Sequence, residues 1–283
     1  MKIAVIIPAA GAGTRFGDAP ETGAATSGGP SKIEIDLAGR PVFMRSIELF
    51  LNRHEVGQII LAVNPDAIDD FKFRWGDKLG FHGVKVIPGG TVERWETVSK
   101  ALDTIDDNCT HVAVHDAARP LATSKLIDDL LDAAAKHNAV VPGLPVSATL
   151  RRVANDESGA AEEDPLDAIL GSAGKPSYSV RRAVEPVDRT NVVEIQTPQF
   201  FEIDLLRRAY AQIGSIDTSS ITDDAGLVES LGESVFVIDG ESTNLKITHP
   251  ADAELAQALI EKRESKSKVD LAKKRLFADD DDF

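Results

Sequence analysis

The 283-residue sequence contains one cysteine and no long hydrophobic run. Cys109 cannot form an internal disulfide, and a single thiol without a second cysteine does not indicate a zinc site. A reducing cytoplasm is therefore the expected location. Residues 1–8 carry one basic side chain and too few apolar ones for a signal peptide or a membrane span, so we expect no export signal and no membrane partner.

Positive charge is also scarce. The chain has 31 Lys and Arg against 46 Asp and Glu, which gives a formal net charge of −15. Such a charge repels a phosphate backbone, so sequence-independent nucleic-acid binding is not expected. A small anionic substrate remains compatible, because a few cations can create a local positive pocket. With 42% hydrophobic and 27% charged residues, the composition is that of a folded globular protein.

Several common catalytic motifs are missing. The sequence has no GxSxG, no HExxH and no P-loop lysine, and its six histidines stand singly without metal-ligand spacing. The dinucleotide-binding fingerprint also fails, because Phe16 occupies the position of its third glycine. These absences argue against a triad hydrolase, a zinc protease and a dinucleotide-dependent enzyme.

Short apolar runs alternate with segments of helical spacing. The runs at 3–7, 59–63, 84–87, 111–114 and 139–141 are typical of strands buried on both faces. Segments 42–51, 92–105 and 126–134 have helical spacing. The alternation predicts a three-layer α/β/α fold with a mainly parallel sheet, in which ligands bind at the carboxyl ends of the strands.

Three segments depart from this pattern. Residues 18–29 are small, polar and glycine-rich, which predicts a loop. Residues 154–188 lie between possible strands at 146–153 and 180–184, and we interpret them as a hairpin-like arm with an inserted loop. We therefore expect one domain over 1–262 with an arm at about 146–194, followed by a charged tail over 263–283 without fixed structure.

A glycine-rich turn follows the first predicted strand. Small residues there let the backbone approach a ligand, and successive amides point at phosphate oxygens. Arg15 adds a charged fork suited to phosphate, and Lys32 follows the glycine-rich loop as a second cation. A tight turn with a surface arginine explains the turn about equally well. The candidate backbone contacts are Pro8, Ala9, Ala10, Gly11 and Gly13.

Two later strands are also followed by candidate binding residues. Gly89 and Gly90 suit a turn that faces a ligand, and Arg94 and Thr97 lie three apart on the next helix. Asp116 ends the central strand and needs a cationic partner or a metal, which makes it the candidate metal ligand. Arg119 is a candidate for the same site, although it also fits a purely structural ion pair.

Nine motifs in order then resemble the 2-C-methyl-D-erythritol 4-phosphate cytidylyltransferase family. They span roughly residues 2–262, and a set of this size is far more specific than any single motif. In sequence order they read PAAGAGTRFG, PSK, PGGTVERWETV, VHDAARP, TLRR, VDR, QTPQFF, ITDDAGLVE and NLKITHP. The family implies a Rossmann-like nucleotidyltransferase fold, a homodimer formed through the protruding arm, and Mg²⁺-dependent transfer of CMP from CTP to the polyol phosphate.

The resemblance also implies a role for each matching residue. Arg15 and Lys32 match cations on the triphosphate, and Lys246 matches a basic residue near the polyol phosphate. Arg119, Thr149 and Arg189 match residues that bind that phosphate, the last two from the neighbouring subunit. Asp116 and Thr222 match contacts to the polyol hydroxyls, with Mg²⁺ held mainly by CTP. Positions that match CTP contacts are Ala9, Ala10, Gly89, Gly90, Thr97 and Ala117.

The proposed chemistry needs no general base, because a phosphate monoester is already mostly a dianion at pH 7. Three other functions remain open: a cytidylyltransferase for another polyol phosphate such as ribitol 5-phosphate, a non-catalytic nucleotide-binding protein, and a sugar-nucleotide transferase that uses UTP or GTP. The pairing of Thr149 with Arg189 favours methylerythritol phosphate. Two segments, 18–29 and 149–189, are longer than the family pattern leads us to expect.

Overall fold

The computed structural model describes residues 1–11, 31–154, 181–217 and 221–278, with side chains up to residue 266. Two compact units make up the chain. One consists of Met1–Leu144 and Ile195–Phe283, and the other is Pro145–Glu194. Gly13, Arg15 and most of the predicted loop and arm insertion therefore lie outside the described residues.

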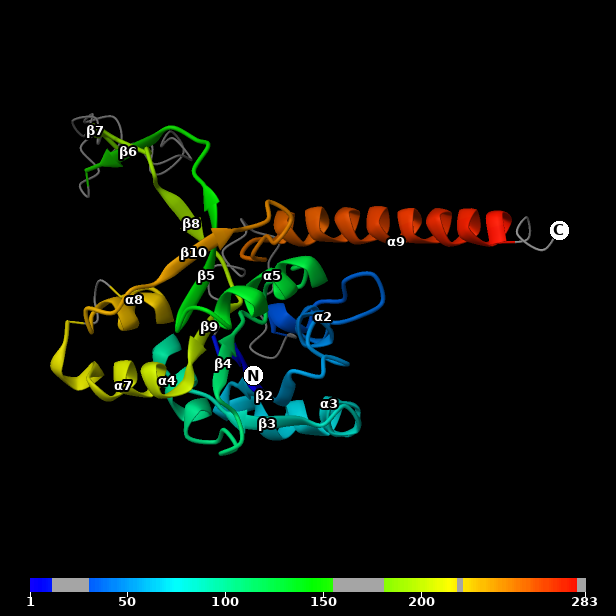
Figure 1. Cartoon of the computed structure of the whole chain (residues 1–283), viewed down its shortest axis with the longest axis horizontal. Coiled ribbons are helices and arrows are strands. Elements are labelled where there is room, and N and C mark those ends of the chain that lie inside the picture. The colour runs from blue at the N-terminus through cyan, green and yellow to red at the C-terminus, as the bar shows by residue number, and fades with distance from the viewer. Residues whose placement is uncertain (12–30, 155–180, 218–220, 279–283) are drawn as a thin grey trace, which may run out of the picture. The chain divides into compact units, whose positions relative to one another are not determined.

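A mainly parallel sheet forms the centre of the larger unit (Figure 1). All strand pairs of this sheet order are parallel except those of β9, which runs antiparallel to both of its neighbours, β4 and β5. All five predicted strands are confirmed. The strand order is β10 (Phe236–Asp239), β5 (Ala139–Pro145), β9 (Gln199–Glu202), β4 (His111–Val114), β1 (Ile3–Ala9), β2 (Val56–Val63) and β3 (Val84–Pro88), and β8 (Val193–Ile195) pairs with β5.

Helices cover both faces of the sheet, as the three-layer prediction requires. Alternate residues of β1 point to opposite faces, so Val5 and Ile7 pack into one core cluster while Ala4 and Ile6 pack into another. The first cluster includes side chains of α2 (Val42–Glu48), α3 (Ile68–Phe81) and α5 (Ser124–Ala134). The second includes side chains of α4 (Arg94–Leu102), α7 (Ile203–Ala211) and α8 (Asp224–Glu229).

Several chain segments meet at the end of the sheet where the parallel strands have their carboxyl ends. Strands β1, β2, β3 and β4 are parallel, so their carboxyl ends meet there. Because β9 runs against β4, with Gln199 opposite Val114, β9 begins where β4 ends. Residues that precede β9 therefore lie beside residues that follow β4. This arrangement positions the site described below.

The last helix differs from the sequence-based expectation. Helix α9 (Pro250–Ala278) continues through residues 263–278, which were expected to lack structure. Proline opens this helix at a position where its missing N–H does no harm, and no glycine or further proline follows before Ala278. The segment is also rich in good helix formers, so nothing in it ends the helix. Ala256 and Ile260 fix the base of the helix in a third apolar cluster.

The smaller unit, Pro145–Glu194, contains an antiparallel pair of strands. Strands β6 (Leu150–Val153) and β7 (Ala183–Val187) pair with Leu150 opposite Val187. Arg152 Nε lies 3.0 Å from Glu185 Oε1 across the pair. Both strands begin three or more residues later than the predicted 146 and 180, because the cross-strand register sets where pairing starts.

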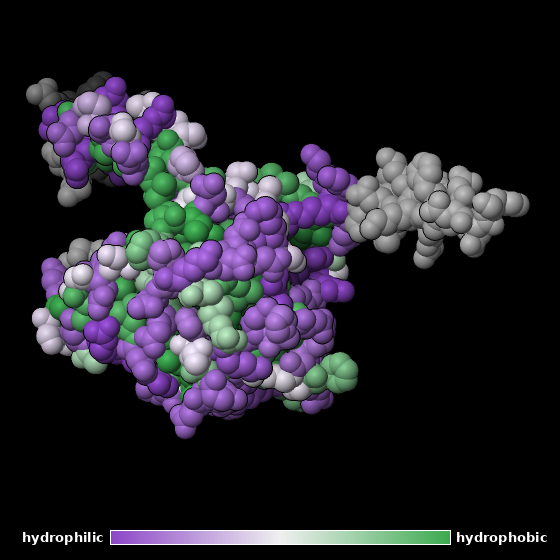
Figure 2. Space-filling model, in the orientation of Figure 1, coloured by the Kyte–Doolittle hydropathy of each residue, from purple (hydrophilic) through white to green (hydrophobic). Residues whose placement is uncertain are grey.

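Hydrophilic residues cover most of the face shown in Figure 2. A charged fraction of 27% leads us to expect such a surface. In the part of the chain that the structure describes, no helix is both long and apolar enough to cross a membrane.

Candidate functional site

Two cavities lie at the carboxyl edge of the sheet and share Arg94, Asp116 and Lys246. Cavity A, of about 480 Å³, is lined by Pro8, Ala9, Ala10, Gly11, Lys32, Ile33, Asn64, Asp66, Gly90, Thr91, Val92, Glu93, Arg94, Thr97, Asp116, Ala117, Ala118 and Lys246. Cavity B, of about 400 Å³, is lined by Arg94, Asp116, Arg119, Val141, Ile195, Thr197, Gln199, Thr222, Asp223, Ala225, Glu229, Val235, Val237 and Lys246.

Small residues form much of the wall of cavity A. Gly90 N–H donates to Thr97 Oγ1 at 2.9 Å, which fixes the turn after β3 against the first turn of α4. A Cβ on Gly90 would lie 2.5 Å from Glu96 Cβ, so only glycine fits this turn. Gly89 does not line the cavity. It packs against two residues that do, since a Cβ on Gly89 would lie 2.6 Å from Ala10 Cβ and 3.0 Å from Thr97 Cγ2.

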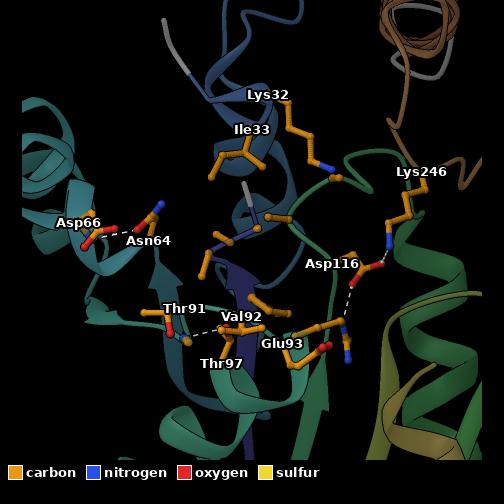
Figure 3. A pocket seen from close by; sticks show the side chains of 18 residues that line it. Lys32, Ile33, Asn64, Asp66, Thr91, Val92, Glu93, Thr97, Asp116 and Lys246 are labelled. Carbon is orange, nitrogen blue, oxygen red and sulfur yellow. Dashed lines mark hydrogen bonds and ion pairs between the residues drawn. The ribbon is translucent and has the colours of Figure 1, made fainter. Parts of the chain in front are cut away.

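Lys32 enters cavity A from a short helix, η1 (Lys32–Glu34), that is fixed at both ends (Figure 3). Ser31 N–H donates to Glu34 Oε2 at 3.3 Å. The carboxylate of Glu34 also pairs with Arg74 and accepts a 2.9 Å hydrogen bond from Trp75 Nε1 of α3. Ile33 is buried in the core beside them. Lys32 therefore sits on an anchored turn rather than on a free loop.

Asp116 is the charge centre that both cavities share (Figure 3). Its Oδ2 lies 2.7 Å from Lys246 Nζ and 3.8 Å from Arg119 Nε, and its Oδ1 lies 3.4 Å from Arg94 Nε. Burial alone would raise the pKa of Asp116, but Arg94, Lys246 and Arg119 hold that pKa well below its usual range. Three cations thus converge on one carboxylate, and Arg94 and Lys246 line both cavities, where their N–H groups can bind anionic ligands.

Arg94 is held from its other side by a buried acid. Its Nη1 donates to Asp224 Oδ2 at 2.7 Å, and Tyr210 O–H donates to Asp224 Oδ1 at 2.5 Å. Asp224 is fully buried, so an unpaired charge there would be costly. Burial lowers the pKa of Arg94, but Asp224 and Asp116 outweigh it and keep that pKa above its usual value. Arg94 is therefore permanently charged and braced between two carboxylates.

A neutral histidine orients the backbone around Asp116. His115 Nε2 lies 3.0 Å from the Arg119 carbonyl, which can only accept, so Nε2 carries the proton. Its Nδ1 then accepts from the Thr197 hydroxyl at 3.2 Å, and Thr197 Oγ1 accepts from Asp116 N–H at 3.0 Å. Burial lowers the pKa of His115 to about 4, which keeps the ring neutral at pH 7.

The loop that carries Lys246 is tied to the loop that follows β4. Arg119 Nη1 donates to the Asn244 carbonyl at 2.7 Å, and Ile247 N–H donates to the Ala118 carbonyl at 2.8 Å. Asn244 is fully buried, and its Nδ2 donates to the Thr197 carbonyl at 2.9 Å. These bonds link the two cationic loops to each other and to the start of β9.

The described residues do not support Asp116 as a metal ligand. Its two oxygens already face three cationic side chains, and a divalent ion beside them would be repelled. No cluster of three or more His, Cys, Asp or Glu side chains suited to a metal occurs among the residues that the structure places. Any Mg²⁺ would have to be held mainly by a phosphate-bearing ligand.

The structure brings together most of the residues that the sequence singles out. Cavity A collects Pro8, Ala9, Ala10, Gly11, Lys32, Gly90, Thr97 and Ala117, cavity B collects Arg119 and Thr222, and both include Arg94, Asp116 and Lys246. Gly13 and Arg15 lie outside the described residues. Thr149 and Arg189 belong to the smaller unit, where Arg189 Nη1 donates to the Ser147 carbonyl.

Sequence reasoning missed several residues of the site. Asn64 and Asp66 line cavity A from the segment after β2, where Asp66 N–H donates to Asn64 Oδ1 at 2.9 Å. The rule that ligands bind beyond the carboxyl ends of strands points to this segment and could have found both. The buried pair of Asp224 and Tyr210 has no such local signal, because the pairing depends on tertiary structure.

Comparison with known proteins identifies the fold and its relatives. The family model for 2-C-methyl-D-erythritol 4-phosphate cytidylyltransferase matches residues 3–165 and 178–262. The enzyme of that name from Frankia casuarinae is 36% identical over 92% of this chain and 81% of its own length. The Acidobacterium capsulatum enzyme is 34% identical over 94% of this chain and its whole length.

Solved structures agree with this assignment. The crystal structure of 2-C-methyl-D-erythritol 4-phosphate cytidylyltransferase from Thermus thermophilus matches with a TM-score of 0.64 and 29% identity, covering 92% of this chain and 100% of that one. The Anaerococcus prevotii 4-diphosphocytidyl-2C-methyl-D-erythritol synthase matches with a TM-score of 0.68 and 25% identity over 92% of this chain and 96% of its own. The chain belongs to the 2-C-methyl-D-erythritol 4-phosphate cytidylyltransferase family.

Proposed function

We propose that cavity A binds CTP and cavity B binds 2-C-methyl-D-erythritol 4-phosphate, so that the protein transfers CMP from the first to the second and releases pyrophosphate in isoprenoid synthesis. One observation carries the assignment of the two cavities. Asp116, Arg94 and Lys246 border both of them, which would bring two anionic substrates side by side against the same two cations.

The reaction needs positioning and charge neutralisation rather than proton transfer. An oxygen of the acceptor phosphate attacks the α-phosphorus of CTP, and the bond from that phosphorus to the oxygen of the leaving pyrophosphate breaks. The acceptor phosphate is mostly a dianion at pH 7, so no base has to activate it. Cations that stabilise charge on the α-phosphoryl group and the leaving group lower the barrier. His115, with its pKa lowered to about 4 by burial, takes no part in proton transfer.

Each wall of cavity A suits a part of CTP. Ala9, Ala10, Gly90 and Ala117 leave the backbone accessible, so peptide groups can read the cytosine edge. Lys32 faces the same cavity and would contact the triphosphate. We propose that Arg15 is the second cation on the triphosphate. We also propose that Pro8, Gly11, Gly13, Gly89, Arg94 and Thr97 complete the nucleotide site, Gly89 by supporting its wall.

Cavity B suits a phosphorylated polyol. Arg119 and Lys246 supply positive charge, while Asp116 and Thr222 supply oxygen atoms that can bind hydroxyl groups. Val141, Ile195, Val235 and Val237 add an apolar side to the same cavity. We propose that Mg²⁺ acts with CTP, held mainly by its phosphates, where it would neutralise phosphate charge.

We further propose that the protein is a cytoplasmic homodimer in which Thr149 and Arg189 of one subunit reach the acceptor phosphate of the other. A complementation assay tests this arrangement. Lys32→Met and Arg189→Ala should each be inactive alone, but a mixed dimer contains one site with neither change. An equimolar mixture, in which about half of the dimers are mixed, should therefore restore roughly a quarter of wild-type activity. If mixing restores no activity although mixed dimers form, Arg189 acts within its own subunit.

The function itself is tested by pyrophosphate release with purified protein and Mg²⁺. CTP, UTP, ATP and GTP are each paired with 2-C-methyl-D-erythritol 4-phosphate and with ribitol 5-phosphate. Turnover confined to CTP with methylerythritol phosphate is the expected result. Turnover with ribitol phosphate alone would change the substrate, and CTP binding without pyrophosphate release would contradict catalysis.

A further inference from the structure

Arg263 connects the last helix to the two cationic loops of cavity B. Its Nη1 donates to the Leu121 carbonyl at 2.8 Å, and its Nη2 donates to Thr243 Oγ1 at 2.8 Å. Leu121 lies two residues after Arg119, and Thr243 lies three residues before Lys246. One guanidinium group therefore bridges the segments that carry the two substrate-side cations.

An apolar cluster supports the same junction. Leu121 and Ile247 pack with Ala256 and Ile260 of α9, and all four are nearly or fully buried. Leu37, from the segment that follows the Lys32 helix, belongs to the same cluster. Helix α9 thus contacts chain segments beside three cations of the site. Asp252 of α9 accepts from Thr248 N–H, after Lys246, whereas Arg263 binds both loops of cavity B.

We propose that Arg263 is a positioning residue that sets the spacing of Arg119 and Lys246 for the acceptor phosphate. A guanidinium group suits this task because its planar fork donates to two acceptors in fixed directions. The family match ends at residue 262, so Arg263 lies just beyond it. The proposal rests on the assignment of cavity B to the polyol phosphate.

Geometry distinguishes this role from simple helix anchoring. The apolar cluster already attaches α9 to the rest of its unit. Arg263 adds bonds to a backbone carbonyl of one loop and to a side chain of the other, and Arg119 itself donates to the Asn244 carbonyl next to Thr243. Without Arg263, the two loops keep their direct bonds but lose the third support at their outer side. The phosphate cations would then shift relative to each other.

Steady-state kinetics of the full-length variants test the proposal. For Arg263→Ala we expect the KM for methylerythritol phosphate to rise roughly five- to tenfold, with kcat at saturation and the KM for CTP near wild type, as loss of a charge-assisted hydrogen bond implies. Arg263→Lys should give an intermediate value, because one ammonium group cannot reproduce the fork. Lys262→Ala, an exposed neighbour on the same helix, is the matched control and should leave all constants unchanged.

A double-mutant cycle gives a second readout. Thr243→Val removes one acceptor of Arg263, so its effect on the methylerythritol phosphate KM should be largely absent in the Arg263→Ala background. A lower melting temperature with an unchanged KM would overturn the proposal and leave Arg263 as a helix anchor. Equal rises in both KM values would also overturn it. Failure of the wild-type protein to turn over would instead contradict the proposed function.

Discussion

Cavities A and B are adjacent, but different kinds of residue line them. Cavity A has a wall of small residues, including Ala9, Ala10, Gly90 and Ala117, whose backbone is the accessible surface. Cavity B includes Asp116, whose carboxylate is paired with Arg94, Arg119 and Lys246 in a network of charged side chains. A site that reads a base edge needs close backbone approach, whereas a site for a phosphorylated polyol needs cations kept at fixed spacing.

The two cavities should therefore be sensitive to different kinds of substitution. Cavity A depends on residues with very short side chains or none, so substitutions that add side-chain atoms to its wall should weaken ligand binding. Cavity B depends partly on pairs that are distant in sequence, such as Asp116 with Thr197, 81 residues apart, and Arg94 with Asp224, 130 residues apart, so removing one partner should damage it.

Lys32→Met should have the largest effect, because it removes a cation from cavity A without removing much side-chain volume. We expect kcat to fall about 10²- to 10³-fold, the loss typical of one group that stabilises developing charge. The melting temperature should stay near wild type, since Ile33 and Glu34 anchor the helix. Lys72→Met, an exposed lysine of α3, is the control. Wild-type turnover in folded Lys32→Met protein would contradict the assignment.

Asp224→Asn tests the buried support of cavity B. The change removes the charge that pairs with Arg94, so the free energy of unfolding should fall by about 1–3 kcal/mol, a value reduced because Arg94 is partly exposed. Both KM values, measured by pyrophosphate release, should rise, because Arg94 lines both cavities. Glu233→Gln breaks an exposed pair with Arg208 and should cost about 0–1 kcal/mol. Equal losses in the two variants would show that burial does not matter here.

His115 makes stability depend on pH. Its pKa is about 4 in the folded protein and 6.5 when unperturbed, so the unfolded chain binds a proton first as the pH falls. The contribution of His115 is complete above pH 6.5 and is lost between pH 6.5 and about 4, on the order of 3 kcal/mol in total. Denaturant unfolding across this range measures the slope.

Two substitutions distinguish the contribution of His115 to this slope from the contributions of other groups. His115→Gln should remove it, whereas His54→Gln, at an exposed site, should not. The pKa of Asp116 is held below its ordinary value of 3.8, so its contribution is lost only at lower pH. An unchanged slope between pH 6.5 and 4 in His115→Gln would show that another group titrates there.

Gly90→Ala tests the wall of cavity A. The added Cβ would lie 2.5 Å from Glu96 Cβ and 3.0 Å from Thr97 N, so the turn must shift, at a cost of about 1–3 kcal/mol in stability and with a higher KM for CTP. A Cβ on Gly11 would have no non-neighbouring atom within 4 Å among the residues that the structure describes, so Gly11→Ala should leave stability unchanged, although Gly11 lines the same cavity. Thermal unfolding of both variants shows whether the space around the added Cβ determines the loss of stability, or whether any Gly→Ala change causes it.

The wall of cavity A could be predicted from sequence, because small residues directly after a buried strand are a local signal. The network of cavity B could be predicted only in part. Asp223 and Asp224 look equivalent in sequence, yet Asp223 accepts from Gly226 N–H at the start of α8 while Asp224 turns into the core. The partners of Asp224 come from α4 and α7, and no local pattern links those elements.

The fold shows the same division. Continuous apolar runs predicted the five parallel strands, since strands buried on both faces carry them. The sequence did not predict the antiparallel strand β9. Gln199–Glu202 is short, and it forms a strand by pairing with β4 on one side and β5 on the other, which are distant in sequence. Helix α9 extends to Ala278 because its residues are good helix formers, although the charged composition after residue 262 predicted a tail without fixed structure. The roles of Thr149, Arg189 and Mg²⁺ stay predictions.

The position of β9 beside β5 also bears on how the family can vary in length. The chain leaves the sheet after β5 and returns to pair with it, with Ala139 opposite Phe201, so the two ends of the excursion are held by adjacent strands. Doubling a loop of this kind adds only about 0.6 kcal/mol of closure entropy. The family match skips residues 166–177, inside this excursion. Insertions there can therefore accumulate at little thermodynamic cost while β5 and β9 stay paired.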